Sequence, residues 1–251
     1  MEKKQKVIIV MPAYNAEKTL VKTLADIPTG SADEIILVDD ASSDHTAELA
    51  KKLGLHVIVH KENLGYGGNQ KTCYKKALEH GADIVVMLHP DYQYDPRIVP
   101  YISGLIKENI CDIMLANRIR TRGEAIAGGM PLYKYIFNRF LTFVENIFLG
   151  LNLGEYHTGY RAFSKKALET IPYENNSNDF VFDQEILMQA AYFRFRIGEI
   201  PVPAKYFKDA SSINLLRSTI YGISTLITVV KYVLAKTGIY RSSIFRTKTS
   251  R

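Results

Sequence analysis

The stretch LVDDASSDHT, residues 37–46, decides the fold more than any other part of the chain. An apolar run over 35–38 stops on two adjacent carboxylates, Asp39 and Asp40, and a Ser/Asp/Thr cluster then opens a helical pattern. An unbroken apolar run bounded by polar turn residues is typical of a buried parallel strand. In an open α/β sheet, ligands bind beyond the carboxyl ends of such strands. We therefore expect Asp39 and Asp40 to border a binding cleft.

Strand and helix patterns alternate over residues 6–117. Such alternation predicts an α/β fold of the Rossmann-like kind, a mostly parallel sheet with helices on both faces. The rhythm breaks beyond about residue 125, where a second functional layer is expected. We expect strands at 7–11, 34–38, 56–60, 84–88 and 112–116, and helices at 17–27, 44–53, 69–80 and 96–107.

The net charge of the 251-residue chain is concentrated at its C-terminus. Seven basic and no acidic residues follow position 209, which accounts for the whole formal charge of +6. Such a tail is attracted to an anionic lipid surface, and the alternative is a solvated, frayed terminus. Nucleic acid is not an expected partner, because the basic residues show no interleaved base-stacking aromatics. Two cysteines without metal or disulfide spacing, and no signal peptide, indicate a cytoplasmic protein.

Phosphate-binding glycine motifs are missing from the strand ends. The loop MPAYNAE, residues 11–17, lacks the glycines of G-x-G-x-x-G, and the chain has no P-loop. The glycines at 65–68 fit a turn with positive φ as well as they fit phosphate contact. Carboxylates at the strand ends would instead accept hydrogen bonds from a nucleoside or hold a cation that binds phosphate.

A second acidic strand end follows residues 84–88. His89, Asp91 and Gln93 alternate along the chain, which suits three side chains that face one ion. Together with residues 12–15 and 39–46, this segment gives polar ends to three strands of the same predicted sheet.

These segments together resemble the inverting family 2 glycosyltransferases, which have a GT-A fold and use nucleotide-diphospho-sugars. The resemblance rests on PAYN (12–15), VDDASSDHT (38–46), NLG (63–65) and HPDYQ (89–93). It is strongest to the dolichol- and polyprenyl-phosphate hexosyltransferases, which carry D-x-D-x-Q at the position of 89–93. The implied divalent metal, Mn²⁺ or Mg²⁺, would be bound by His89, Asp91 and Gln93. The resemblance implies donor contacts from Pro12, Tyr14, Asn15, Glu17, Asp39, Asp40, Asp91 and Lys205.

His89 departs from the pattern of the resembled family, which has aspartate there. Because a neutral imidazole favours transition metals over Mg²⁺, we expect a preference for Mn²⁺. The alternative is that His89 only caps the strand and never contacts a metal.

The second half of the chain is expected to bind the acceptor. Three arginines alternate in NRIRTRG, residues 117–123, and the resemblance places Arg118 near the diphosphate or an acceptor phosphate. An apolar helical stripe over 132–151 is interrupted by Lys134 and Arg139, as in a helix that lies in a membrane interface beside lipid phosphates. The alternative is a packed helical hairpin or a dimer contact.

The expected catalytic residues are Asp91, Arg118 and Asp183. Asp183 is the first candidate for the general base that transfer to a hydroxyl requires. A polyprenyl phosphate is already anionic, so with that acceptor Asp183 would orient groups rather than remove a proton.

The sequence predicts a glycosyltransferase domain over 1–212, with a donor half (1–123) and an acceptor half (124–212). The uncharged stretch of the basic, amphipathic segment 213–251, residues 218–230, is too short and too polar to span a bilayer. We expect the segment to lie at the membrane, and the alternative is that it packs on the domain. We expect a hexose to pass from a UDP- or GDP-sugar to polyprenyl phosphate with inversion, at the inner face of the membrane. The alternatives are a soluble hydroxyl acceptor and a non-catalytic nucleotide-sugar-binding protein.

Overall fold

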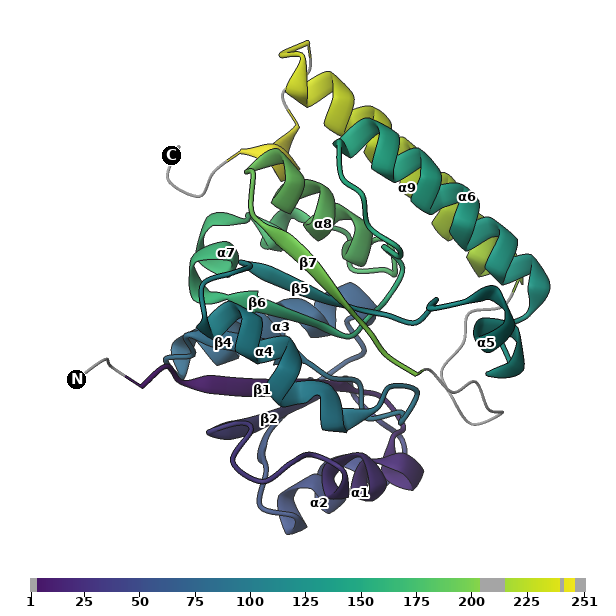
Figure 1. Ribbon diagram of the computed structural model, residues 1–251. Coiled ribbons are helices and arrows are strands. Elements are labelled where there is room, and N and C mark those ends of the chain that lie inside the picture. The colour runs from purple at the N-terminus through teal and green to yellow at the C-terminus, as the bar shows by residue number, and fades with distance from the viewer. Residues whose placement is uncertain (1–3, 204–214, 240–241, 247–251) are drawn as a thin grey trace.

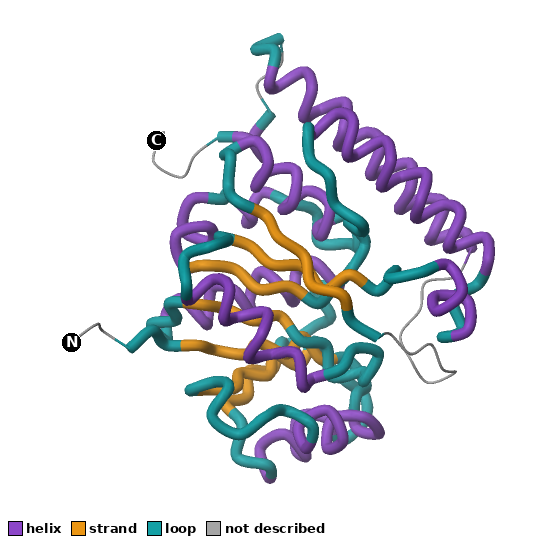
Figure 2. The backbone as a smooth tube through the Cα atoms, viewed as in Figure 1, coloured by secondary structure: helices purple, strands orange, loops and turns teal. Residues whose placement is uncertain are grey.

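The computed structural model describes residues 4–203, 215–239 and 242–246. A seven-stranded sheet runs through the middle of the molecule, and helices cover both of its faces (Figure 1, Figure 2). The strand order is β3-β2-β1-β4-β6-β5-β7. The strands are β1 Val7–Ala13, β2 Glu34–Asp39, β3 His56–Val59, β4 Ile84–Met87, β5 Ile113–Asn117, β6 Arg161–Ser164 and β7 Ile197–Pro201.

Two apolar cores lie on the two faces of the sheet, because successive strand residues point in opposite directions. Ile8 and Val10 of β1 belong to the core under α3, α6, α7, α8 and α9, whereas Ile9 and Met11 belong to the core under α1, α2 and α4. The prediction of helices on both faces is thus confirmed. The helices are α1 Glu17–Ala25, α2 Thr46–Lys52, α3 Tyr66–Glu79, α4 Val99–Lys107, α5 Arg122–Ala127, α6 Leu132–Leu149, α7 Lys165–Thr170, α8 Phe182–Tyr192 and α9 Leu215–Lys236, with short 3₁₀ turns at Pro96–Ile98, Tyr173–Asn175 and Ser243–Phe245.

Strand β6 is the one strand that runs antiparallel to its neighbours in the sheet. It lies between β4 and β5, with Phe163 opposite both Val85 and Ile113. The sequence patterns did not predict this strand, because four residues that begin with Arg161 show no alternation of apolar and polar side chains. The sheet is therefore mixed but mostly parallel.

Helix α3 begins at Tyr66, three residues before the predicted start at Asn69. The early start depends on Gly67, whose backbone N–H donates to Asn178 O at 2.7 Å. A Cβ at Gly67 would lie 2.5 Å from Ser177 O, so only glycine lets the helix approach this segment. Gly65, just before the helix, has a φ of +84°, as the turn interpretation of these glycines predicted.

Helices α6 and α9 lie side by side (Figure 1). Their polar sides face inward. Asn138, Thr142 and Glu145 of α6 are buried, as are Thr225 and Thr228 of α9. The opposite sides form one exposed apolar face, which we call the α6–α9 face. Its large exposed side chains are Leu132, Tyr133, Ile136, Phe137, Phe140, Phe143, Ile147, Phe148, Leu216, Ile220, Ile223, Ile227 and Val230.

One helix in the described part of the chain, 216–236, has the length and composition to cross a membrane. This helix is longer than the uncharged stretch 218–230, because the chain remains helical beyond Lys231. After the helix, residues 242–246 return to the domain, where Ile244 and Phe245 are buried in the core beside α8. This part of the tail is therefore packed rather than frayed.

The close packing of α3 against residues 177–178 can be tested by urea denaturation. We expect Gly67→Ala to lower the free energy of unfolding by about 1–3 kcal/mol, because the new methyl group overlaps a backbone carbonyl. Gly104→Ala in α4 is the matched control, since a Cβ there meets nothing within 4 Å. It should raise stability by up to about 1 kcal/mol through helix propensity. Equal effects of the two substitutions would contradict this explanation.

Candidate active site

The ends of β1, β2 and β4 meet at one edge of the sheet, as predicted. Ala13 pairs with Asp39, and the loops that follow β1 and β2 are hydrogen-bonded to each other. Asn15, with a φ of +52°, accepts through Oδ1 from Ser43 N at 2.9 Å. Glu17 Oε2 accepts from His45 N at 3.2 Å. Two predicted donor residues of the first loop are thus hydrogen-bonded to the loop that follows Asp39. Tyr14, between Ala13 and Asn15, has 57% of its surface exposed.

Asp39 and Asp40 differ in what they bind. Asp39 accepts from the backbone N–H and hydroxyl of Ser42, within its own loop. Asp40 accepts from His60 Nδ1 at 2.7 Å and from Leu64 N and Gly65 N at 2.9 and 3.0 Å. The Asp40 carboxylate therefore organises the 60–65 loop, and a donor contact by Asp40 stays a prediction.

His89 lies in a cluster with Tyr66 and Asp183. The rings of His89 and Tyr66 are stacked, with centroids 5.5 Å apart, and Tyr66 Oη lies 3.4 Å from His89 Nε2. The Tyr66 hydroxyl donates to Asp183 Oδ2 at 2.7 Å, and Gln70 Nε2 lies 3.1 Å from Asp183 Oδ1. Both carboxylate oxygens of Asp183 are thus held by α3. The sequence patterns missed Tyr66 and Gln70 because nothing in the chain links them to a residue more than 110 positions away.

The electrostatics of this cluster favour a neutral imidazole. Burial lowers the pKa of His89 and outweighs the nearby carboxylates of Asp91 and Asp183, which act to raise it. Gly159 is required beside the ring, because a Cβ there would lie 2.8 Å from His89 Nε2. A neutral His89 keeps one ring nitrogen with a lone pair, the form that can bind a metal.

The predicted metal segment forms a tight turn beyond β4. Asp91 Oδ1 accepts from Gln93 N at 3.1 Å, and Tyr92 between them has a φ of +58°. An imidazole, a carboxylate and an amide oxygen fit a divalent ion that takes its other ligands from a diphosphate and water. Among the described residues, the one group of three His, Cys, Asp or Glu side chains with ligand atoms within 4.8 Å lies elsewhere. Metal binding by His89, Asp91 and Gln93 therefore stays a prediction.

Arg118 is paired with a buried carboxylate that the sequence patterns missed. Its backbone N–H donates to Glu155 Oε2 at 2.7 Å, and its Nε donates to Oε1 at 3.0 Å. Burial acts to raise the pKa of Glu155, but the Arg118 guanidinium more than offsets this effect and the pKa is lowered. Arg118 is therefore fixed in place by an ionised partner.

The other predicted acceptor residues converge on the same region. Arg139 donates to Gly154 O at 2.5 Å, next to Glu155. Lys134 is partly buried, and burial and the charge of Arg118 together lower the pKa of its ammonium group. No carboxylate of a described residue pairs with Lys134. The structure thus brings together Arg118, Lys134 and Arg139, whereas Arg120 is exposed and pairs with Glu124 at 3.0 Å. Lys205 lies outside the described residues.

Arg161, the first residue of β6, is completely buried. Its guanidinium donates to the backbone carbonyls of Thr158 at 2.7 Å, Asp183 at 2.6 Å and Tyr156 at 3.0 Å. Arg161 Nη1 also lies 3.6 Å from Asp183 Oδ1. One charged side chain therefore fixes both the 156–158 loop and the start of α8.

A second cluster of buried polar side chains connects α6 and α9 to α8. His157 Nδ1 lies 2.8 Å from Tyr221 Oη of α9, and His157 Nε2 lies 3.3 Å from Glu145 Oε2 of α6. Gln184, adjacent to Asp183, lies 2.9 Å from the same Nδ1. Burial lowers the pKa of His157 to about 3 and raises the pKa of Glu145 well above its usual range. The two groups are therefore an imidazole and a carboxylic acid, both uncharged.

Comparison with known proteins identifies the family. Residues 8–172 match the family model described as Glycosyl transferase family 2, and the chain belongs to this family. It is 30% identical over 217 residues to the UDP-N-acetylglucosamine–dolichyl-phosphate N-acetylglucosaminyltransferase of Methanococcus voltae, covering 80% of this chain and 86% of that one. It is 25% identical over 204 residues to the undecaprenyl-phosphate mannosyltransferase of Micrococcus luteus, covering 78% and 82%. The protein is thus a glycosyltransferase.

A solved structure confirms the fold class. Glucosyl-3-phosphoglycerate synthase of Mycobacterium tuberculosis, in complex with Mn²⁺, UDP-glucose and phosphoglyceric acid, aligns with a TM-score of 0.69 over 95% of this chain and 81% of that chain. The two sequences are 20% identical, so the likeness shows the fold, and the predicted GT-A-like, mostly parallel architecture is correct.

The uncharged state of Glu145 yields a pH prediction. The unfolded chain releases the carboxyl proton of Glu145 above pH 4.5, whereas the folded protein keeps it. The contribution of Glu145 to the free energy of unfolding therefore falls as the pH rises. The stability of the wild type relative to Glu145→Gln should therefore decrease by up to about 1.4 kcal/mol per pH unit above that point. Urea denaturation from pH 4 to pH 8 measures it. A difference that is constant with pH would mean that Glu145 is ionised when buried.

Proposed function

We propose that this glycosyltransferase moves a hexose from a UDP- or GDP-sugar to a polyprenyl phosphate, with inversion, at the cytoplasmic face of a membrane. The observation that carries the proposal is that Lys134 lies at the start of α6, beside Arg118 and at one end of the α6–α9 face. A cluster of cations next to an exposed apolar surface matches an acceptor with a phosphate head and a hydrocarbon tail. The two named relatives carry polyprenyl phosphates in their names, which supports this acceptor class.

The α6–α9 face supports the membrane part of the proposal. Polar side chains of α6 and α9 face the protein, and most of their large apolar side chains face outward, the reverse of an ordinary soluble helix. Exposed apolar surfaces of this extent mark a binding site for another molecule or a membrane. With cations at its border, the face suits the interface of an anionic bilayer.

The donor would bind at the ends of β1, β2 and β4. Tyr14 would stack on the base, and Pro12, Asn15, Glu17, Asp39 and Asp40 are our other proposed nucleoside contacts. His89, Asp91 and Gln93 would hold a divalent ion, Mn²⁺ in preference to Mg²⁺, which would balance the charge of the diphosphate. Solved structures of this fold contain Mn²⁺ with UDP or UDP-glucose, and one contains Mg²⁺ with UDP, which supports a divalent ion here but no preference between the two.

The transfer itself would be a single displacement. An acceptor phosphate oxygen attacks the anomeric carbon while the bond from that carbon to the diphosphate oxygen breaks, so that the nucleoside diphosphate leaves with the electron pair. Arg118 and Lys134 would hold the acceptor phosphate, and Arg139 would fix the loop beneath it. Asp183 would orient the site through Tyr66 and Gln70, since a phosphate acceptor has no proton that must be removed.

A vesicle experiment tests the membrane part. Ile147→Glu places a charge in the middle of the α6–α9 face, at a side chain that is 59% exposed. We expect this variant to lose co-flotation with anionic vesicles and transfer to polyprenyl phosphate in them. The matched control is Ile110→Glu, at a side chain that is 57% exposed after α4. If Ile147→Glu still floats like the control, the face does not bind the membrane.

A kinetic experiment tests the acceptor part. Lys134→Ala should raise the KM for a short, water-soluble polyprenyl phosphate by about tenfold or more, because a charge-assisted hydrogen bond to phosphate contributes about 1.5–3 kcal/mol. The KM for the nucleotide sugar should change little. Lys107→Ala at the end of α4 is the control for loss of a surface lysine. An unchanged acceptor KM in Lys134→Ala would mean that Lys134 does not bind the acceptor phosphate.

A further inference from the structure

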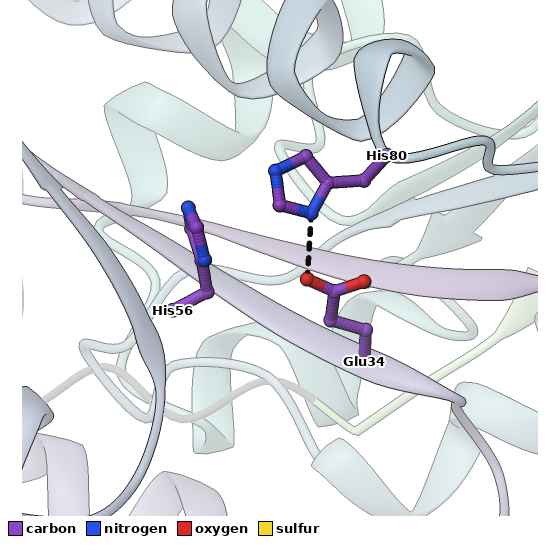
Figure 3. Close-up of side chains that lie close together, drawn as sticks. All are labelled: Glu34, His56 and His80. Carbon is purple, nitrogen blue, oxygen red and sulfur yellow. Dashed lines mark hydrogen bonds and ion pairs between the residues drawn. The ribbon is translucent and has the colours of Figure 1, made fainter.

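A second cluster of metal-ligating side chains lies far along the sheet from the donor site. Glu34 is the first residue of β2, His56 is the first residue of β3, and His80 directly follows α3. All three are therefore at the amino-terminal end of the parallel strands, whereas the donor residues are at the carboxyl end. One ligand atom from each of the three side chains lies within 4.8 Å of the others (Figure 3).

The fold itself brings these residues together. His56 pairs with Ile36, and Glu34 is two residues before Ile36, so both side chains are on one face of the sheet. The same face carries Ile36 and Val38, which share a core with Tyr74 and Ala77 of α3. Helix α3 thus covers this face, and its C-terminal end brings His80 to Glu34.

The contacts orient the carboxylate for a cation. Lys6 Nζ holds Glu34 Oε2 at 2.9 Å and also donates to the backbone carbonyl of His80 at 2.9 Å. The other oxygen, Oε1, is 2.7 Å from His80 Nδ1 (Figure 3). Such outer hydrogen bonds to a carboxylate ligand are typical of protein metal sites.

His56 distinguishes this cluster from an ordinary hydrogen-bonded pair. Its ring lies against that of His80, with centroids 4.5 Å apart and planes at 73°. Neither ring nitrogen of His56 makes a hydrogen bond to any described residue, and the side chain is exposed. A second imidazole with an available lone pair therefore stands beside a histidine–glutamate pair and is open to solvent.

We propose that Glu34, His56 and His80 bind a divalent transition metal ion, with Zn²⁺ as the best match. Two imidazole nitrogens and one carboxylate oxygen are a common zinc ligand set, and imidazole ligands favour Zn²⁺ over Mg²⁺ and Ca²⁺. The exposure of His56 leaves room for water as a further ligand. The bound ion fastens the edge strand β3 to β2 and to the end of α3, and it acts independently of the donor site.

The test is titration of the nucleotide-free, full-length protein with Zn²⁺ by calorimetry. The wild type should bind one equivalent, and Zn²⁺ should raise its melting temperature. His56→Ala should weaken binding by about tenfold or more without loss of folding, because the removed side chain is exposed and makes no hydrogen bond. His80→Ala should weaken it as well.

Two controls separate this site from other sources of binding. His45→Ala removes an exposed histidine whose Nδ1 lies 3.2 Å from Glu48 Oε2, and it should bind Zn²⁺ as the wild type does. Asp91→Asn should also bind one equivalent of Zn²⁺ as tightly as the wild type does. This result would show that the ion is bound away from the donor site. The proposal is overturned if His56→Ala binds like His45→Ala, or if the wild type binds no Zn²⁺.

Discussion

The structure depends on the buried guanidinium of Arg161. An unpaired charge in a protein interior costs several kcal/mol, so its donors must find acceptors. The chain supplies three backbone carbonyls, two from the 156–158 loop and one from Asp183 at the start of α8. Because Arg161 stands on β6, next to β4, these contacts fix the acceptor loops to the strand that leads to His89. Arg161 thus joins the donor and acceptor halves, together with the contacts of Tyr66 and Gln70 to Asp183.

The inward polar sides of α6 and α9 follow from the same arrangement. The 154–158 loop receives hydrogen bonds from Asn138 of α6 and Tyr221 of α9, and Glu145 of α6 lies 3.3 Å from His157. When the polar sides of both helices are used in this way, their apolar sides face outward. The exposed apolar surface is therefore a consequence of how the site is covered, and it places a lipid-compatible face next to Arg118 and Lys134.

The strands and their polar ends could be predicted from the sequence, because the apolar runs of β1, β2 and β4 are unbroken and stop at side chains that carry chemistry. Strand β6 could not, since four residues beginning with an arginine show no period. Glu155, Tyr66 and Gln70 were missed for another reason: their partners lie 37 to 117 positions away, and only the folded chain brings them together. The same holds for Glu34, His56 and His80. The glycines at 67 and 68 were expected in a loop before the helix, with a turn and phosphate contact both open, although they lie in the first turn of a helix that packs closely on the 177–178 segment.

The central claim, that the acceptor is a polyprenyl phosphate, is tested most directly by nucleoside diphosphate release from a panel of UDP- and GDP-hexoses. Each donor is incubated with Mn²⁺ and either vesicles containing a polyprenyl phosphate, phosphoglyceric acid, or no acceptor. The account predicts release from at least one donor that depends on the polyprenyl phosphate and yields a glycosylated lipid. Release with phosphoglyceric acid but not with the lipid would contradict it, as would no release under any of the three conditions.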